Sequence, residues 1–249
     1  MSTSPNKIPL LKIENISKSF GDKHILENIS FEILEGEIIS IFGLSGCGKS
    51  TLLSILCGYQ KQDSGKITCV SGTCKKLIFS GLRESEAVRS LFGFASQEPS
   101  FYPNLTVYDN LKYFGTLLSV PKNELDDRIF DILHILNLTG VESNVSSSLS
   151  EGMKKRLDIA CSIIHNPRIL ILDEPTANLD FQLRDELLEY IQEINKLGMT
   201  IIFVSHYIDE VIQISDRVAI ISNSYLEVMN NDATFKSQYQ NKLNRRELK

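Results

Sequence analysis

Apolar and polar residues alternate in the first part of the chain and later give way to continuous apolar runs. Residues 11–16 and 28–33 alternate along their length, which is typical of strands with one buried face. Residues 38–42, 169–172 and 200–204 are almost wholly apolar, which predicts strands whose two faces are both covered. Together these patterns predict short antiparallel strands near the N-terminus and a buried parallel sheet further along the chain.

The middle of the chain has helical spacing instead. Thr106 is a candidate N-cap for a helix that ends before Pro121, and apolar residues recur at helical spacing over residues 123–137. A third helix is expected after the serines at 146–148, and residues 181–197 predict a fourth that ends at a glycine. The order of elements therefore predicts an α/β core, at about residues 10–96 and 167–231, interrupted by a helical insert at about 97–166.

Length and composition are those of a globular protein with one large domain or two small ones. The chain has 249 residues, of which 42% are hydrophobic and 23% charged. No apolar run approaches the roughly 20 residues that span a bilayer, and the first residues lack the apolar core of a signal peptide. We therefore expect a cytoplasmic protein whose contact with a membrane, if any, is made through a partner.

Charge and cysteine content exclude other classes. The net charge of −5 argues against a nucleic-acid partner, and the basic tail within residues 232–249 is interpreted as a solvated end. The cysteine count is odd and no C-x-x-C pair occurs, which predicts reduced thiols and no metal site. The cysteines are Cys47, Cys57, Cys69, Cys74 and Cys161.

A glycine-rich segment between a predicted strand and a predicted helix carries the strongest chemical signal. It fits the phosphate-binding pattern G-x-x-x-x-G-K-[ST] and reads Gly43, Leu44, Ser45, Gly46, Cys47, Gly48, Lys49, Ser50, Thr51. Backbone N–H groups of such a turn face one anion, and the helix N-terminus adds the positive end of its dipole. Lys49 adds a full charge, and the Ser50 hydroxyl can bind a magnesium ion.

Two carboxylates follow the apolar run at residues 169–172. A buried parallel strand would deliver Asp173 to its carboxyl end, where ligands bind in open α/β sheets. Asp173 can hold magnesium through water, and Glu174 points differently and can polarise an attacking water. The alternative is that two acids simply end a strand in solvent.

Several further motifs, in order along the chain, resemble those of the ATP-binding cassette (ABC) ATPases from about residue 10 to residue 231. Residues 95–99 resemble the family's Q-loop, 149–153 its signature, 177–180 its D-loop and 204–206 its switch-histidine segment. Phe20 lies where the family places an aromatic that stacks on adenine. Taken singly, Phe20 could be a core aromatic, Gln97 an ordinary surface residue and His206 a structural histidine.

The resemblance implies a P-loop NTPase core with a parallel sheet, an N-terminal antiparallel β subdomain and an inserted helical subdomain, all in one nucleotide-binding domain over residues 1–249. It implies binding of ATP and Mg²⁺, with two such domains closing head to tail around two ATP molecules. The residues implied for catalysis are Glu174, His206, Gln97 and Lys49. Those implied for nucleotide are Phe20, the loop at 43–51, Ser150 and Gly152, and those for metal are Ser50, Gln97 and Asp173.

The signature departs from the family pattern. Glu151 replaces its first glycine and Met153 its usual glutamine, so this half-site could be weak unless the carboxylate points to solvent. The chain could then pair with a second ABC subunit instead of with itself, or could be a regulatory cassette that barely hydrolyses ATP.

The implied role is to power a transporter, on the cytoplasmic face of the membrane, through separate transmembrane permease subunits. Residues 103–111 and 152–157 resemble exporter-type subunits for drugs, lipids or polysaccharides. Phe101 and Tyr102 lie where the family docks its membrane subunits, and the alternative is that they pack inside the helical insert. A soluble ABC ATPase of translation or DNA repair is the alternative function.

Overall fold

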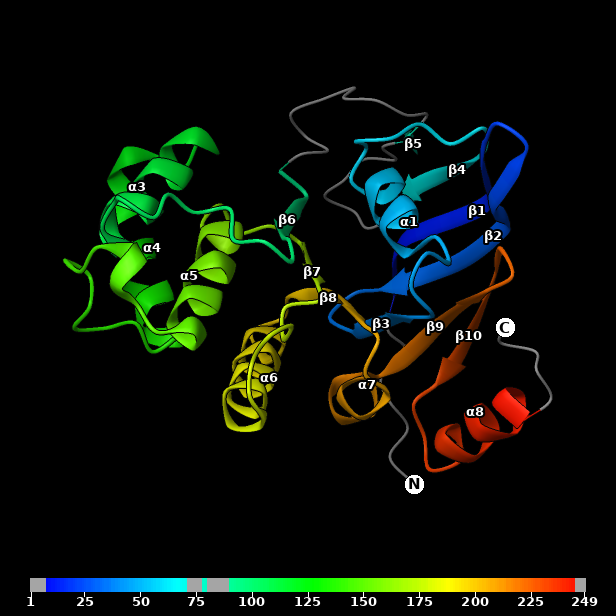
Figure 1. The fold of residues 1–249 in the computed structure, drawn as a ribbon. Coiled ribbons are helices and arrows are strands. Elements are labelled where there is room, and N and C mark those ends of the chain that lie inside the picture. The colour runs from blue at the N-terminus through cyan, green and yellow to red at the C-terminus, as the bar shows by residue number, and fades with distance from the viewer. Residues whose placement is uncertain (1–7, 71–77, 80–89, 245–249) are drawn as a thin grey trace. The chain divides into compact units, whose positions relative to one another are not determined.

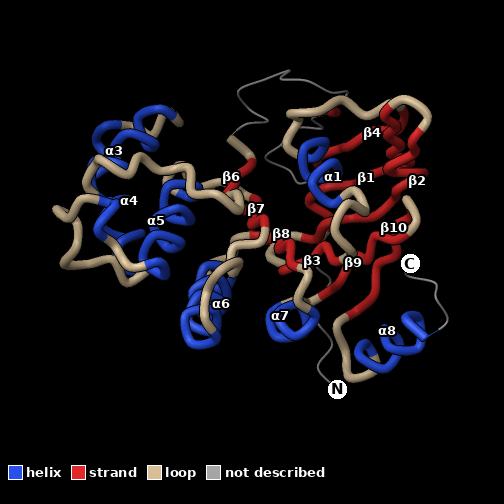
Figure 2. The backbone as a smooth tube through the Cα atoms, in the orientation of Figure 1, coloured by secondary structure: helices blue, strands red, loops and turns tan. Residues whose placement is uncertain are grey.

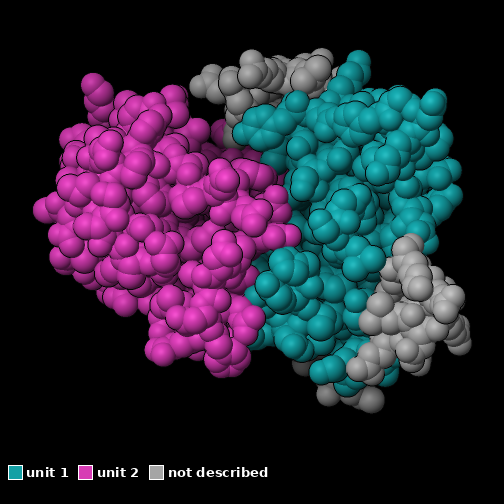
Figure 3. Space-filling model, in the orientation of Figure 1, with its two compact units in different colours: residues 1–89, 200–249 teal, residues 90–199 magenta. Residues whose placement is uncertain are grey.

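The computed structural model describes residues 8–70, 78–79 and 90–244, and divides into two compact units (Figures 1 and 3). Unit 1 comprises residues 1–89 and 200–249, and unit 2 comprises residues 90–199. Residues 1–7, Cys74 and the last five residues of the basic tail lie outside the described residues. In the described part of the chain no helix is long and apolar enough to cross a membrane. The expected single domain with an insert at 97–166 stays a prediction.

Unit 1 contains an antiparallel sheet in the order β2-β1-β4-β5. Strands β1 (Pro9–Phe20) and β2 (Lys23–Leu34) form a hairpin in which Phe20 pairs with Lys23. Strand β4 (Ser64–Cys69) pairs with β1, and β5 (Ile78–Phe79) pairs with β4. The alternating pattern at the start of the chain therefore forms the predicted antiparallel β subdomain.

The second group of strands in unit 1 is mostly parallel. Strand β3 (Ile38–Phe42) lies between β8 (Thr200–Ser205) and β9 (Arg217–Ser222) and is parallel to both, while β10 (Tyr225–Asn230) is antiparallel to β9. Every residue of β3 and β8 is buried, as continuous apolar strands require. The helices of this unit are α1 (Lys49–Leu56), α7 (Ile208–Ile214) and α8 (Phe235–Asn244).

Unit 2 is mainly helical, as Figure 2 shows. Its strands β6 (Phe92–Ala95) and β7 (Ile169–Asp173) are parallel to each other. Its helices are α3 (Val107–Leu117), α4 (Lys122–Ile135), α5 (Glu151–Ile163) and α6 (Phe181–Lys196), with a 3-10 turn, η1 (Ser146–Ser148), before α5. The predicted N-cap is confirmed, because Thr106 accepts a hydrogen bond from the Asp109 N–H at 3.0 Å.

One cysteine departs from the expected chemistry. Cys69, the last residue of β4, is disulfide-bonded, so the prediction of reduced thiols is wrong at this position. Cys47, Cys57 and Cys161 are free, as predicted. Burial raises the pKa of the Cys57 thiol to about 12, which leaves it protonated and inert.

A buried ion pair fixes the start of β3, the strand that leads to the phosphate-loop segment. Glu37 is only 1% exposed, and its two carboxylate oxygens accept hydrogen bonds from Arg217 at 2.7 and 2.8 Å. The same carboxylate accepts from the Leu34 N–H, and Arg217 also donates to the Glu32 carbonyl. The bidentate pair therefore joins β2, β3 and β9 at one point.

Replacing Glu37 should destabilise unit 1 strongly. Glu37→Ala leaves the Arg217 guanidinium partly buried without its carboxylate, which should lower the free energy of unfolding by about 3–5 kcal/mol. Urea denaturation followed by circular dichroism measures this change. The matched control is Glu32→Gln, which breaks an exposed ion pair with Lys12 and should cost less than about 1 kcal/mol. Equal losses in the two variants would contradict this assignment.

Candidate phosphate-binding site

The predicted phosphate loop connects β3 to α1 in unit 1. Gly48 is the N-cap of α1 and has φ of +109°, a conformation that side-chain-bearing residues rarely adopt. A Cβ atom at Gly43 would lie 2.6 Å from the Ile221 carbonyl oxygen, so the loop passes the end of β9 too closely for a side chain. The strand, the turn and the helix therefore follow the predicted order, and the two glycines are required by the local backbone.

Lys49 is the first residue of α1 and its side chain folds back over the loop. Its ammonium donates hydrogen bonds to the carbonyl oxygens of Gly43, at 2.8 Å, and Leu44, at 3.1 Å. Lys49 is only 7% exposed, and in the described part of the chain both of these partners are neutral. Carbonyl groups compensate a nearly buried cation less fully than a negative charge does, so this geometry favours an anionic ligand at the loop.

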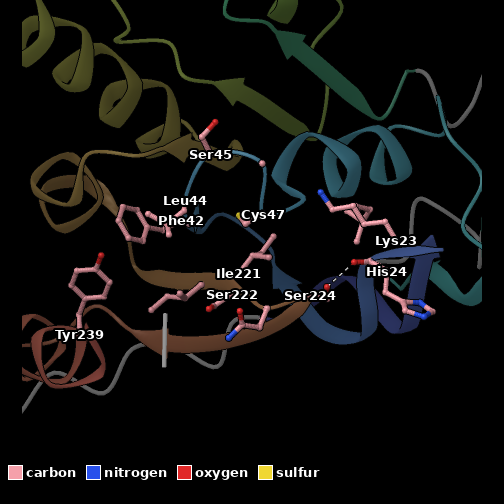
Figure 4. A pocket seen from close by; sticks show the side chains of 15 residues that line it. Lys23, His24, Phe42, Leu44, Ser45, Cys47, Ile221, Ser222, Ser224 and Tyr239 are labelled. Atoms are coloured by element: carbon pink, nitrogen blue, oxygen red, sulfur yellow. Dashed lines mark hydrogen bonds between the residues drawn. The ribbon is translucent and has the colours of Figure 1, made fainter. Parts of the chain in front are cut away.

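The first half of the loop lines a pocket of about 280 Å³ within unit 1 (Figure 4). Its other walls are the start of β2, the turn between β9 and β10, and Tyr239 of α8, which meets Phe42 edge-on at 5.3 Å. The Ser224 hydroxyl donates to the His24 carbonyl at 2.9 Å and closes one wall. The first half of the loop therefore borders this pocket. The second half continues into α1, whose Leu52 and Leu56 are buried in the core.

Two further predicted residues lie in the same unit. Phe20 ends β1 with its ring 51% exposed, so it is not a core aromatic, and the Lys18 ammonium lies 5.4 Å from the ring centroid. His206 directly follows β8, whose last residue, Ser205, pairs with Phe42 of β3. Since the carboxyl ends of parallel strands meet at one edge, His206 and the loop start from neighbouring strand ends.

The backbone around His206 is braced by a residue that the sequence analysis missed. Glu210 of α7 is buried and accepts a hydrogen bond from the Ser205 hydroxyl at 2.6 Å, and the same hydroxyl accepts from the Tyr207 N–H at 3.0 Å. The His206 ring is exposed and lies 4.0 Å from the Tyr207 ring, centroid to centroid. An acid four residues after a histidine at a strand end is the signal that could have identified this brace.

Unit 2 carries the two predicted carboxylates. Residues 169–172 of β7 are buried and Asp173 ends the strand at intermediate exposure. Glu174 has φ of +49°, a strained conformation for a side-chain-bearing residue, and such strain concentrates at functional sites. Ala95 of β6 pairs with Leu172 of β7, so Gln97 leaves the sheet at the same edge as the two acids.

The predicted signature residues lie at the start of α5 in unit 2. Ser150 is the N-cap and accepts a hydrogen bond from the Met153 N–H at 3.3 Å. A Cβ at Gly152 would meet the Leu183 side chain at 3.0 Å, which explains a glycine here by packing against α6. The Glu151 side chain is exposed and pairs with Lys154 at 2.8 Å. The Glu151 carboxylate therefore points to solvent and is paired with Lys154. This orientation is the condition, predicted from the sequence, under which the signature half-site is not weakened.

Comparison with known proteins decides the family. Residues 26–177 match the family described as ABC transporter. The chain belongs to this family. It is 36% identical over 212 residues to the linearmycin resistance ATP-binding protein LnrL of Bacillus subtilis. It is 37% identical over 220 residues to YdbJ of the same organism, an uncharacterized ABC transporter ATP-binding protein, and 33% identical over 220 residues to the spermidine/putrescine import ATP-binding protein PotA of Legionella pneumophila.

These alignments cover most of this chain but only part of each relative. The alignment with LnrL covers 85% of this ABC chain and 66% of LnrL. The alignment with YdbJ covers 88% of this chain and 68% of YdbJ, and the alignment with PotA covers 88% of this chain and 58% of PotA. Among solved structures, cbiO1 of Clostridium perfringens, part of the ABC transporter complex cbiONQ, matches with a TM-score of 0.80 and 28% identity, covering 94% of this chain and 95% of that one. An ABC cassette in its ADP conformation matches with a TM-score of 0.82 and 23% identity over 97% of each chain. The predicted mixed α/β cassette fold is therefore confirmed.

Each unit carries an oxygen donor of the kind that magnesium prefers. In the described residues no cluster of three or more His, Cys, Asp or Glu side chains could hold a metal. Mg²⁺ bound with a nucleotide needs only one or two protein oxygens, because substrate phosphates and water supply the rest. The hydroxyl of Ser50, exposed on α1, and the carboxylate of Asp173 are oxygen donors of this kind.

The predicted site residues of this ABC chain are divided between the two units. Unit 1 contains Phe20, the loop at 43–51 and His206, whereas unit 2 contains Gln97, Ser150, Gly152, Asp173 and Glu174. Within each unit the strand pairings bring the strand-end residues to a common edge. The catalytic and ligand-binding roles of all these residues stay predictions.

Proposed function

We propose that this chain is the ATP-hydrolysing subunit of an ABC transporter. The observation that carries the proposal is the Lys49 ammonium, nearly buried against two neutral carbonyls of the phosphate loop in a member of this family. The β- and γ-phosphates of ATP supply negative charge for this ammonium, and the exposed ring of Phe20 offers a face for the adenine.

The proposed reaction is in-line attack of water on the γ-phosphorus. Glu174 accepts the proton of the attacking water, and Lys49 and the loop amides stabilise the charge that develops on the phosphate oxygens. His206 contacts the γ-phosphate, and Gln97 contacts the metal site and the water. Ser50 and Asp173 would hold magnesium, which would supply positive charge to neutralise the phosphates. Lys49, Ser50 and His206 of unit 1 and Gln97, Asp173 and Glu174 of unit 2 thus have proposed roles in the same reaction.

A second cassette completes the proposed site. Ser150 and Gly152 lie at the N-terminus of α5, whose first-turn N–H groups and positive dipole end suit a phosphate bound by the other subunit. The exposed, Lys154-paired carboxylate of Glu151 supports a working signature rather than a purely regulatory cassette. Either a second copy of this chain or another ABC subunit can supply this helix end.

The proposed cargo is exported, and it is a drug, a lipid or a polysaccharide. Export is supported by the exporter-like segments at 103–111 and 152–157 and by the relative LnrL, which is named for resistance. Another relative, PotA, is named for import, so the direction of transport is a point for experiment. The chain would work on the cytoplasmic face of the membrane with separate transmembrane permease subunits.

An aromatic cluster in unit 2 is the proposed contact for those permeases. Tyr102 and Tyr113 are each more than 40% exposed, their rings meet edge-on at 4.9 Å and their hydroxyls lie 3.3 Å apart. Phe101, in contrast, is buried, so the expected exposed position is found for Tyr102 and is wrong for Phe101. Exposed tyrosines with apolar rings and polar tips are typical anchors of protein interfaces.

Co-expression with candidate transmembrane permease subunits tests the function. We expect the chain to copurify with them from membranes, and the complex in vesicles to couple ATP hydrolysis to movement of a substrate out of the cytoplasmic side. Tyr102→Ala/Tyr113→Ala should weaken copurification about tenfold or more while ATP binding persists, because truncation of interface tyrosines removes roughly 2 kcal/mol or more. Tyr225→Ala, an exposed tyrosine of unit 1, is the control. Copurification with ribosomes, and none from membranes, would contradict the proposal.

A further inference from the structure

Two charged side chains of α5 contact the backbone just beyond β6. Lys155 donates a hydrogen bond to the Gln97 carbonyl at 2.8 Å. One carboxylate oxygen of Asp158 accepts from the Ser100 N–H at 2.6 Å and from the Ser100 hydroxyl at 2.8 Å. Both side chains come from the helix that begins at Ser150, and all of these residues lie in unit 2.

The segment that they contact, residues 97–100, is exposed to solvent. The position of these residues therefore depends on polar contacts rather than on a core. Lys155 and Asp158 are three residues apart, which places them on one face of the helix. One binds the first residue of the segment and the other binds the last, so the main chain is held at both ends.

Burying the carboxylate of Asp158 costs free energy of folding that an apolar side chain would not cost. Asp158 is only 2% exposed, and burial raises the pKa of its carboxyl, while the two Ser100 donors and the charge of Lys155 lower it. Burial likewise lowers the pKa of the Lys155 ammonium, which Asp158 and Glu151 raise. An apolar side chain at 158 would pack against the core at lower cost, and it could not bind the Ser100 backbone.

We propose that Lys155 and Asp158 are positioning residues that fix the backbone of residues 97–100 to the helix carrying Ser150. This inference rests on the proposed function, because it makes the nucleotide-contacting Gln97 and the phosphate-facing end of α5 parts of one rigid piece. Neither residue touches substrate in this scheme.

Kinetics of the full-length chain with MgATP test the proposal. Asp158→Ala leaves the Ser100 N–H without its acceptor, and kcat should fall by about tenfold or more, since small displacements of positioning groups cost up to roughly 100-fold. The KM for ATP should stay within about twofold, because the loop around Lys49 is unchanged. Asp158→Asn keeps an oxygen acceptor and should restore most of kcat. Lys155→Met should lower kcat as well, whereas the control Lys196→Met removes only an exposed pair with Glu193 and should not.

Hydrogen exchange separates this proposal from the proposed function. In Asp158→Ala the Ser100 amide, which Asp158 binds, and the amides beside it should exchange faster, while α5 keeps its protection and the chain keeps its fold by circular dichroism. Unchanged exchange in this segment, or a folded Asp158→Ala with wild-type kcat, would overturn the positioning role. If the wild-type complex hydrolyses no ATP, the proposed function fails, and the exchange result still decides whether α5 fixes the segment.

Discussion

Glu174→Gln is expected to bind ATP and almost stop hydrolysing it. The amide cannot accept the proton of the attacking water, and loss of a general base costs about 100- to 10,000-fold in rate. Gln has nearly the same shape, so the strained backbone at φ of +49° and the end of β7 should persist. With hydrolysis blocked, the variant should accumulate with ATP as a paired species, either with itself or with a sister cassette.

Phosphate release and analytical ultracentrifugation measure these two effects. The matched control is Glu193→Gln, an exposed carboxylate on α6 whose partner is Lys196, and its turnover should equal that of the wild type. An ATPase rate for Glu174→Gln within twofold of the wild-type rate would remove Glu174 from the proposed reaction.

Lys49→Ala should lose most of the affinity for ATP. The substitution removes the positive charge of the ammonium that contacts the loop and frees the Gly43 and Leu44 carbonyls of this contact. A charge-assisted hydrogen bond contributes roughly 1.5–3 kcal/mol, which corresponds to about a 10- to 100-fold weaker Kd. Equilibrium dialysis with labelled ATP and magnesium measures the change.

Lys66→Ala is the control for charge alone. Lys66 lies in the same unit and forms an exposed pair with Glu14, so its removal lowers the net charge equally without touching the loop. Its Kd for ATP should match that of the wild type. Equal affinities of Lys49→Ala and wild type would show that the loop does not bind the phosphates.

Long periodic segments made much of the fold predictable from sequence. The alternating residues at 11–16 and 28–33 lie in β1 and β2, and the helical pattern at 123–137 corresponds to α4 at Lys122–Ile135. Strand β6 was missed because it has four residues and is interrupted by Gly93, so it offers neither periodicity nor length. Strand β10 was missed because its apolar residues follow no regular alternation, and all of its residues are exposed or half-buried.

The site was predictable where chemistry imposes a residue order. The loop needs glycines at fixed positions, so the turn between β3 and α1 and the place of Lys49 at the start of the helix could be predicted from the pattern alone. The supporting contacts could not, because Glu210 with Ser205, and Asp158 with Ser100, depend on which helix face meets which backbone atom. The disulfide at Cys69 was missed for a different reason, since an odd cysteine count in a chain expected to be cytoplasmic favours free thiols.

Calorimetric titration of the full-length wild-type chain with MgATP tests the central claim most directly. The account predicts saturable binding that ADP competes for and that is weakened at least about tenfold in Lys49→Ala, as expected for a lost charge-assisted contact to phosphate. A wild-type chain that takes up no MgATP, or that binds it equally well without the Lys49 ammonium, would contradict the account.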